Sequence, residues 1–154
     1  MALLEIKTVG DPILKEICEP IKEVDGEIRK LLTDMADTMY DKGGVGLAAP
    51  QIGRAIRVVV IDVGEGLLEM INPVILKREG LATDSEGCLS VPEITGEVER
   101  AESVRVEFIN KRGKKQKLMA HGLLARCIQH EMDHLEGRLF VDIAKKLRKE
   151  AKKK

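Results

Sequence analysis

A chain of 154 residues, 44% of them hydrophobic, is large enough to bury the core of one domain without disulfides or a structural metal. Lysine and arginine together number 26, as do aspartate and glutamate, so the net charge gives no reason to expect a nucleic-acid or membrane partner. The N-terminus has no signal-peptide pattern, the longest apolar run (Val58 to Ile61) cannot span a bilayer, and three cysteines without framework spacing favour a reducing compartment. We therefore expect one cytoplasmic domain over residues 1–154.

The first predicted element is a helix that follows Asp25, a suitable N-cap residue. Apolar residues recur at helical spacing after it, until the pair Gly43 and Gly44 ends the pattern. These apolar residues are Ile28, Leu31, Leu32, Met35 and Met39. Residues 43–53 then hold too much glycine and proline for a regular element.

The middle of the chain predicts strands. Residues 56–63 form an apolar run that is typical of a strand buried on both faces. Residues 67–76 predict a second strand, broken near Pro73 because proline has no N–H to donate to a neighbouring strand. The small and polar residues 82–92 predict a loop or an irregular edge strand.

A hairpin and two helices complete the chain. Residues 97–109 predict a strand that turns at 110–113 and returns through 116–119. A helix follows over 121–136, and residues 142–154 predict a second, charged helix, since seven of the last ten residues are lysine or arginine. This order of elements predicts an α+β fold, with an antiparallel or mixed sheet packed on the 121–136 helix and a helix towards each end of the chain.

The helix over 121–136 carries the sequence HEMDHLEG, which begins at His130. His130 and His134 are one turn apart, so both imidazoles can reach one metal ion. Glu131 lies about 100° around the helix from His130 and can approach a water beside that ion. Leu123 and Cys127 fall on the face of the two histidines, which we expect to point inward. The alternative is a helix whose buried histidines are satisfied by hydrogen bonds alone.

The third metal ligand does not follow from this motif. In zinc proteases the longest version of the motif continues to a third histidine. In this chain Phe140 stands at that position, and phenylalanine cannot bind a metal. Cys127 lies about 10 Å along the helix axis from His134, too far for both to bind one ion at ligand distances of about 2.3 Å. Three downstream acids follow too closely or lie on the charged helix: Glu136, Asp142 and Glu150. This leaves Cys88, in the loop sequence EGCLS.

A third constellation, GVGLAAPQ over residues 44–51, matches the weak dinucleotide fingerprint G-x-G-x-x-A. That interpretation fails because a helix precedes the motif, and Pro50 blocks the helix that should follow it. The small residues instead indicate a close approach of the backbone to a ligand, with Gln51 as an orienting amide. The alternative is a glycine-rich loop packed against the core.

Together, GVGLAAPQ, EGCLS and QHEMDH resemble the three signature motifs of peptide deformylase, in order and in spacing, from about Ile6 to the last helix. The short gap between the first two motifs is similar to the compact bacterial subtype. The resemblance implies that Cys88, His130 and His134 bind a divalent metal, with water as the fourth ligand. In this family the ion is typically Fe²⁺ in the cell, and Zn²⁺, Ni²⁺ or Co²⁺ can occupy the site.

The resemblance also implies a reaction, the hydrolysis of the N-terminal formyl group of formyl-methionine on newly made polypeptides. Glu131 is the implied acid and base, and Gln51 with the Leu89 amide is the implied oxyanion site. The implied substrate-binding residues are Gly44, Val45, Gly46, Leu123 and Cys127, with Gly46 at the substrate backbone and the apolar side chains around the methionine. Ribosome association through the basic 142–154 segment and a monomeric state are further expectations.

Four residues near the motifs extend the resemblance or depart from it. Glu86 and Arg100 are expected to pair and to brace the Cys88 loop. Arg126 stands where many members have an apolar residue near the pocket rim, and Thr95 where some have a basic residue facing the substrate. We expect both departures to affect substrate preference without touching the chemistry.

Two other functions remain open from the residues alone. A zinc endopeptidase shares the His-Glu-x-x-His motif, but the thiol of Cys88 argues against it. A metal-stabilised domain without turnover, whose lysine-rich tail binds the ribosome or RNA, would need four protein ligands. Only His121 and Cys18 remain to supply the fourth, and Glu131 would have no role.

Overall fold

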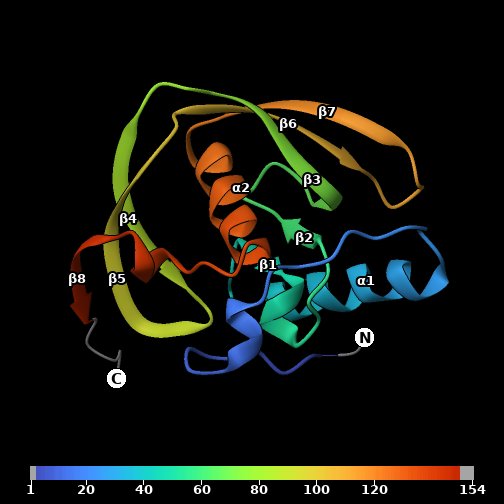
Figure 1. The fold of residues 1–154 in the computed structure, drawn as a ribbon, viewed down its shortest axis with the longest axis horizontal. Coiled ribbons are helices and arrows are strands. Elements are labelled where there is room, and N and C mark those ends of the chain that lie inside the picture. The colour runs from blue at the N-terminus through green and yellow to red at the C-terminus, as the bar shows by residue number, and fades with distance from the viewer. Residues whose placement is uncertain (1–2, 150–154) are drawn as a thin grey trace.

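The computed structural model describes residues 3–149 (Figure 1). Its two α-helices are α1 (Gly26–Asp41) and α2 (Gly122–Leu135). The strands are β1 (Gly46–Ala48), β2 (Val58–Ile61), β3 (Leu68–Glu79), β4 (Ala82–Cys88), β5 (Val91–Arg100), β6 (Ser103–Ile109), β7 (Lys115–His121) and β8 (Lys145–Lys149). They form an antiparallel five-stranded sheet in the order β1-β2-β3-β6-β7 and a second antiparallel sheet in the order β4-β5-β8.

The predicted N-terminal helix is confirmed as α1. Its N-cap Asp25 accepts a hydrogen bond from the Ile28 N–H at 3.0 Å. The predicted apolar residues of the helix are buried, and they pack against Val58 and Val60 of β2. Val59 and Ile61 point to the opposite side of β2, into the cluster that includes α2. The prediction of a strand buried on both faces is therefore confirmed.

The break predicted near Pro73 is a bulge inside a longer strand. The register of β3 against β6 shifts between Ile71 and Val74, and β3 then continues to Glu79. Asn72 takes a φ of 51° there, and its side chain accepts from the Ile21 N–H and donates to the Ile21 carbonyl, both at 2.7 Å. These two hydrogen bonds stabilise the irregular backbone at Asn72, so β3 continues past the bulge.

The segment predicted as a loop or an irregular edge strand forms β4, at one edge of the three-stranded sheet. The predicted hairpin is confirmed as β6 and β7, which pair from Ser103↔His121 to Ile109↔Lys115. Its first strand is shorter than the predicted 97–109, because residues 97–100 belong to β5 in the other sheet. Between these sheets lies α2, at the centre of the view in Figure 1. An α+β fold built around this helix is thus confirmed, and no helix within residues 3–149 is long and apolar enough to cross a membrane.

The prediction of a C-terminal helix over 142–154 is wrong. Residues 145–149 form β8, which pairs with the outer edge of β5, and residues 150–154 lie outside the described part of the chain. Gly96 of β5 explains the docking, because a Cβ there would lie 2.8 Å from both Ala144 Cβ and Leu147 Cδ2. The segment has too few apolar residues to give a helix a buried face, whereas an open strand edge satisfies its backbone groups.

Candidate metal centre

Two elements bring the three predicted metal ligands together. His130 and His134 lie on the buried face of α2, and Cys88 lies at the end of β4. Their ligand atoms all fall within 4.8 Å of one another, and Cys88 Sγ is 3.4 Å from His134 Nε2. Cys127 is not part of this group, and burial raises the pKa of its thiol to about 12. The spacing argument that separated Cys88 from Cys127 agrees with this geometry.

The chemistry of the three side chains fits a divalent ion. Burial lowers the pKa of His134 well below its ordinary value, so its imidazole is neutral, the form that binds metals. His130 Nδ1 lies 2.8 Å from Glu86 Oε1, which assigns a hydrogen to Nδ1. Burial acts to lower the pKa of His130, but the hydrogen bonds with Cys88 and Glu86 outweigh it and raise the pKa to about 10, so a metal at Nε2 would take the place of a proton. Within residues 3–149, the buried atoms His134 Nδ1 and Glu131 Oε1 have no hydrogen-bond partner.

Glu131 places a buried carboxylate beside these ligands. Its Oε1 lies 4.0 Å from His134 Nε2, and burial raises the pKa of the carboxyl group to about 7. A Cβ at Gly46 would overlap Glu131 Oε2, so the carboxylate packs against the bare backbone of β1. A carboxyl group with such a pKa can accept and return a proton near neutral pH.

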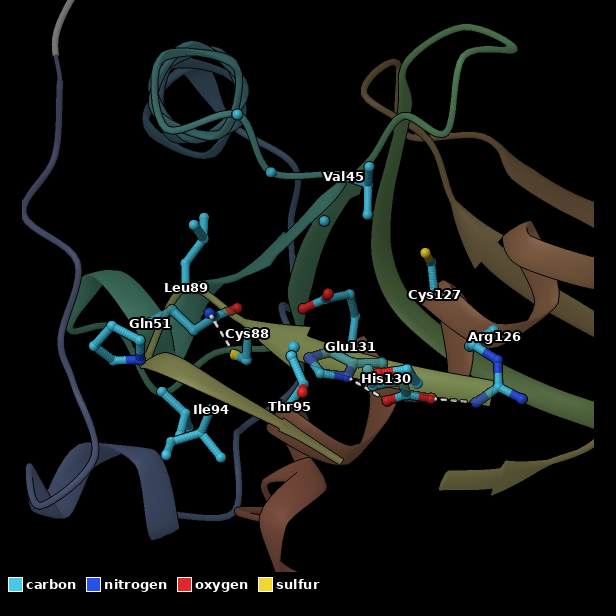
Figure 2. Close-up of a pocket in the computed structure, with 18 of the residues that line it drawn as sticks. Val45, Gln51, Cys88, Leu89, Ile94, Thr95, Arg126, Cys127, His130 and Glu131 are labelled. Carbon is cyan, nitrogen blue, oxygen red and sulfur yellow. Dashed lines mark hydrogen bonds and ion pairs between the residues drawn. The ribbon is translucent and has the colours of Figure 1, made fainter. Parts of the chain in front are cut away.

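Gln51 is fixed in one orientation by three contacts. Its Oε1 accepts from the Ala48 N–H at 2.9 Å, and its Nε2 donates to Ser90 Oγ at 3.1 Å and towards Cys88 Sγ at 3.5 Å. Figure 2 shows the amide pointing at Cys88. Ser90 was missed as a candidate, although its place at the end of EGCLS was a signal. The amide nitrogen is therefore held by Ser90 on one side and faces Cys88 on the other.

Glu86, on the second sheet, connects this sheet to α2. The predicted pairing with Arg100 is confirmed, with Arg100 Nε and Nη2 each 2.8 Å from a Glu86 oxygen. Arg100 Nη1 also donates to Asp133 Oδ2 at 2.6 Å, on the helix itself. Burial acts to raise the pKa of Glu86, but the hydrogen bonds from Arg100 and His130 outweigh it and lower the pKa to about 2. Glu86 is thus a permanent anion that orients His130.

Arg126 lines the pocket, as the sequence suggested, but its guanidinium does not lie at an open rim. We expected it near the pocket rim and away from the chemistry, but its guanidinium is buried and donates to Glu86 Oε2 at 2.6 Å. Arg126 lies beside Cys127 on α2, at a turn that meets β4 and β5 rather than solvent. The sequence could not show which strand this turn of the helix meets.

A pocket of about 480 Å³ opens beside the ligands (Figure 2). All the predicted substrate-binding residues line it, together with Leu89, Ile94 and Thr95. The predicted ones are Gly44, Val45, Gly46, Leu123 and Cys127. Leu123 is 57% exposed, so the expectation that its whole helix face points inward is wrong. The first turn of α2 lies at the mouth of the pocket, and only the later turns are covered.

Comparisons with known proteins show the family of the chain. The family model described as Polypeptide deformylase matches residues 3–150. The chain is 58% identical over 146 residues to a peptide deformylase of Desulfitobacterium hafniense, covering 95% of this chain and 97% of the relative. It is 57% identical over 144 residues to the peptide deformylase of Carboxydothermus hydrogenoformans, covering 94% of this chain and 95% of that one.

Solved structures show the same architecture. The peptide deformylase of Thermotoga maritima superposes with a TM-score of 0.92 at 40% identity, covering 95% of this chain and 100% of that chain. The enzyme of Synechococcus elongatus, solved in complex with actinonin, gives a TM-score of 0.90 at 44% identity, covering 93% and 79%. The chain therefore belongs to the peptide deformylase family, enzymes that remove the N-terminal formyl group from nascent polypeptides.

Proposed function

We propose that this chain hydrolyses the formyl amide of N-formyl-methionyl polypeptides in the pocket beside α2, with Glu131 as the acid and base. The observation that carries this assignment is the buried carboxylate of Glu131, which lies next to three convergent metal-binding side chains. All of these groups come from one chain, which supports a monomer formed by a single domain over residues 1–154. Three free thiols suit a reducing, cytoplasmic setting.

In this proposal Cys88, His130 and His134 hold the metal. One thiolate and two imidazoles suit Fe²⁺, Zn²⁺, Ni²⁺ or Co²⁺ and are unsuited to Mg²⁺ or Ca²⁺, which prefer oxygen ligands. Fe²⁺ is the ion proposed for the cell. When bound, such an ion supplies Lewis acidity that makes a water molecule a nucleophile near neutral pH.

The side chains of the chain then move the proton and hold the developing charge. Glu131 accepts the proton of the attacking water as its oxygen bonds to the formyl carbon. Gln51 Nε2 and the Leu89 N–H donate to the oxygen that becomes negative. Glu131 then gives the proton to the leaving amine as the carbon–nitrogen bond breaks, and formate is released. Water is thus added across the amide bond, and Glu131 ends in the state in which it began.

Specificity for the formyl group is proposed to come from crowding at Gly46 and Glu131. The Gly46 backbone and the Glu131 carboxylate are in contact, which leaves little room for an acyl group larger than formyl. Gly44 and Gly46 let the substrate backbone come close, while the side chains of Val45, Leu123 and Cys127 offer apolar contact to methionine.

Formate release tests this assignment. Protein loaded with Fe²⁺, Ni²⁺ or Co²⁺ is incubated without air with a formyl-methionyl tripeptide and, as control, its acetyl counterpart. We expect formate from the first and no acetate from the second. If none of the three loaded forms releases formate, the proposed function is wrong.

We also propose that the basic C-terminal segment contributes to ribosome association. Within the described residues 142–149 the expected helix is replaced by β8, which exposes Lys145, Lys146, Arg148 and Lys149. Arg148→Ala/Lys149→Ala is expected to lower co-sedimentation with ribosomes at low salt while formate release from small peptides is kept. Binding that neither the substitutions nor raised salt weaken would contradict an electrostatic contact.

A further inference from the structure

Arg126 lies on α2, and its side chain makes three hydrogen bonds to β4 and β5 of the second sheet. Its Nη1 donates to Glu86 Oε2 at 2.6 Å and to the Val98 carbonyl at 2.9 Å. Its Nη2 donates to the Ala82 carbonyl at 2.8 Å. The side chain is 9% exposed, so the planar fork is held inside the protein between α2, β4 and β5.

Burying Arg126 here has a larger desolvation cost than neutralising Glu86 with one arginine would have. Glu86 is already paired in a bidentate manner with Arg100. A second buried cation on the same carboxylate adds a desolvation penalty that only good geometry can offset. The extra contacts of Arg126 are with backbone carbonyls, which fix the position of a strand rather than neutralise a charge.

The position of Arg126 ties together both elements that carry the metal ligands. On α2 it lies one turn before His130, and on β4 its partner Glu86 lies two residues before Cys88. Glu86 accepts from Arg126 through Oε2 and contacts His130 Nδ1 through Oε1. Figure 2 shows this line of contacts running from Arg126 to His130.

We infer that Arg126 is a positioning residue for the metal centre. It fixes the Glu86 carboxylate that orients His130, and it fixes the distance between α2 and the strand that ends in Cys88. Lysine could replace the charge but not the planar fork that reaches a carboxylate and two carbonyls at once. The inference rests on the proposed metal ligands, and it extends them to a pocket-lining residue that acts on the metal centre through Glu86.

The test compares Arg126→Met, Arg126→Lys and the wild-type protein loaded with Co²⁺. Arg57→Met is the matched control, because Arg57 is also largely buried and paired, to Glu136 at 3.2 Å. The measurements are the Co²⁺ absorption spectrum, the rate of Co²⁺ loss to a chelator, and separate kcat and KM values for a formyl-methionyl peptide. Circular dichroism establishes that each variant is folded.

We expect Arg126→Met to lose Co²⁺ about 10- to 100-fold faster, the effect typical of outer-shell partners. Its absorption bands should shift and its kcat should fall, while KM changes little. Arg126→Lys should lie between Arg126→Met and wild type, and Arg57→Met should match wild type. If Arg126→Met does not fold, the spectrum and the loss rate of Arg126→Lys decide in the same way.

Two results would overturn the inference while leaving the proposed function intact. The first is a folded variant with the wild-type spectrum, loss rate and kcat, which would make Arg126 a structural tie only. The second is a raised KM at unchanged kcat, which would make it a determinant of substrate preference. A wild-type protein that binds no Co²⁺ would overturn the proposed function and the inference with it.

Discussion

Glu131 lies beside the three proposed metal ligands but, in the proposed mechanism, binds no metal itself. Glu131→Gln keeps the size of the side chain and removes its ability to take a proton. We therefore expect the metal content to stay and turnover to fall on the order of 10²–10⁴-fold, the usual share of a general acid and base. Metal analysis and formate release on the same sample check this. Loss of the metal instead would make Glu131 a ligand.

Gly46 leaves the space that the Glu131 carboxylate occupies. Gly46→Ala should displace the carboxylate, since the added Cβ would overlap Glu131 Oε2. We expect a large loss of kcat with the metal retained, measured by formate release and metal content. Gly26→Ala is the matched control, because a Cβ there meets only the far end of Arg29 at 3.9 Å. Wild-type kcat in Gly46→Ala would contradict the assigned position of the carboxylate.

Some residue positions could be predicted from the sequence and others could not. The spacing of His130 and His134 on a helix is local, and it places both imidazoles on one face whatever surrounds them. The burial of Arg126 depends on strands far away in the chain, which a helical pattern does not show. Leu123 was misplaced for a similar reason, since exposure at the end of a helix is set by its neighbours.

At the scale of elements, the C-terminal segment shows that composition alone does not determine whether a charged segment forms a helix or a strand. Helix α1 and strand β2 were predictable because their apolar residues repeat with a helical or an unbroken strand pattern. Strand β8 has one apolar residue, Leu147, within a charged run, and its structure comes from the free edge of β5. Such pairing between distant segments leaves no local signal.

Gly96 tests this docking of β8. Gly96→Val should press on Ala144 and Leu147 and lower the free energy of unfolding by roughly 1–3 kcal/mol, the usual cost of overpacking. Chemical denaturation measures the change, and kcat for a small peptide should be kept because Gly96 does not line the pocket. Stability equal to wild type would mean that β8 does not pack on β5 in solution.

At the scale of the whole molecule, the two sheets and α2 form the site together. One sheet carries Gly46, the other carries Cys88, and the helix between them carries both histidines. A thiolate beside an open coordination position makes a reduced iron centre sensitive to oxidation. We therefore expect the Fe²⁺ form to lose activity in air and the Ni²⁺ form to keep it, measured as formate release over time. Equal decay of both forms would contradict this.

The metal content of cysteine variants tests the proposed ligand set most directly. Wild type, Cys88→Ser, Cys127→Ser and Cys18→Ser are loaded with Ni²⁺, dialysed identically and analysed for metal per chain. We expect Cys88→Ser to lose most of its metal, while Cys18→Ser and Cys127→Ser match wild type. If Cys88→Ser kept its metal and Cys127→Ser lost it, the ligand set and the mechanism built on it would be wrong.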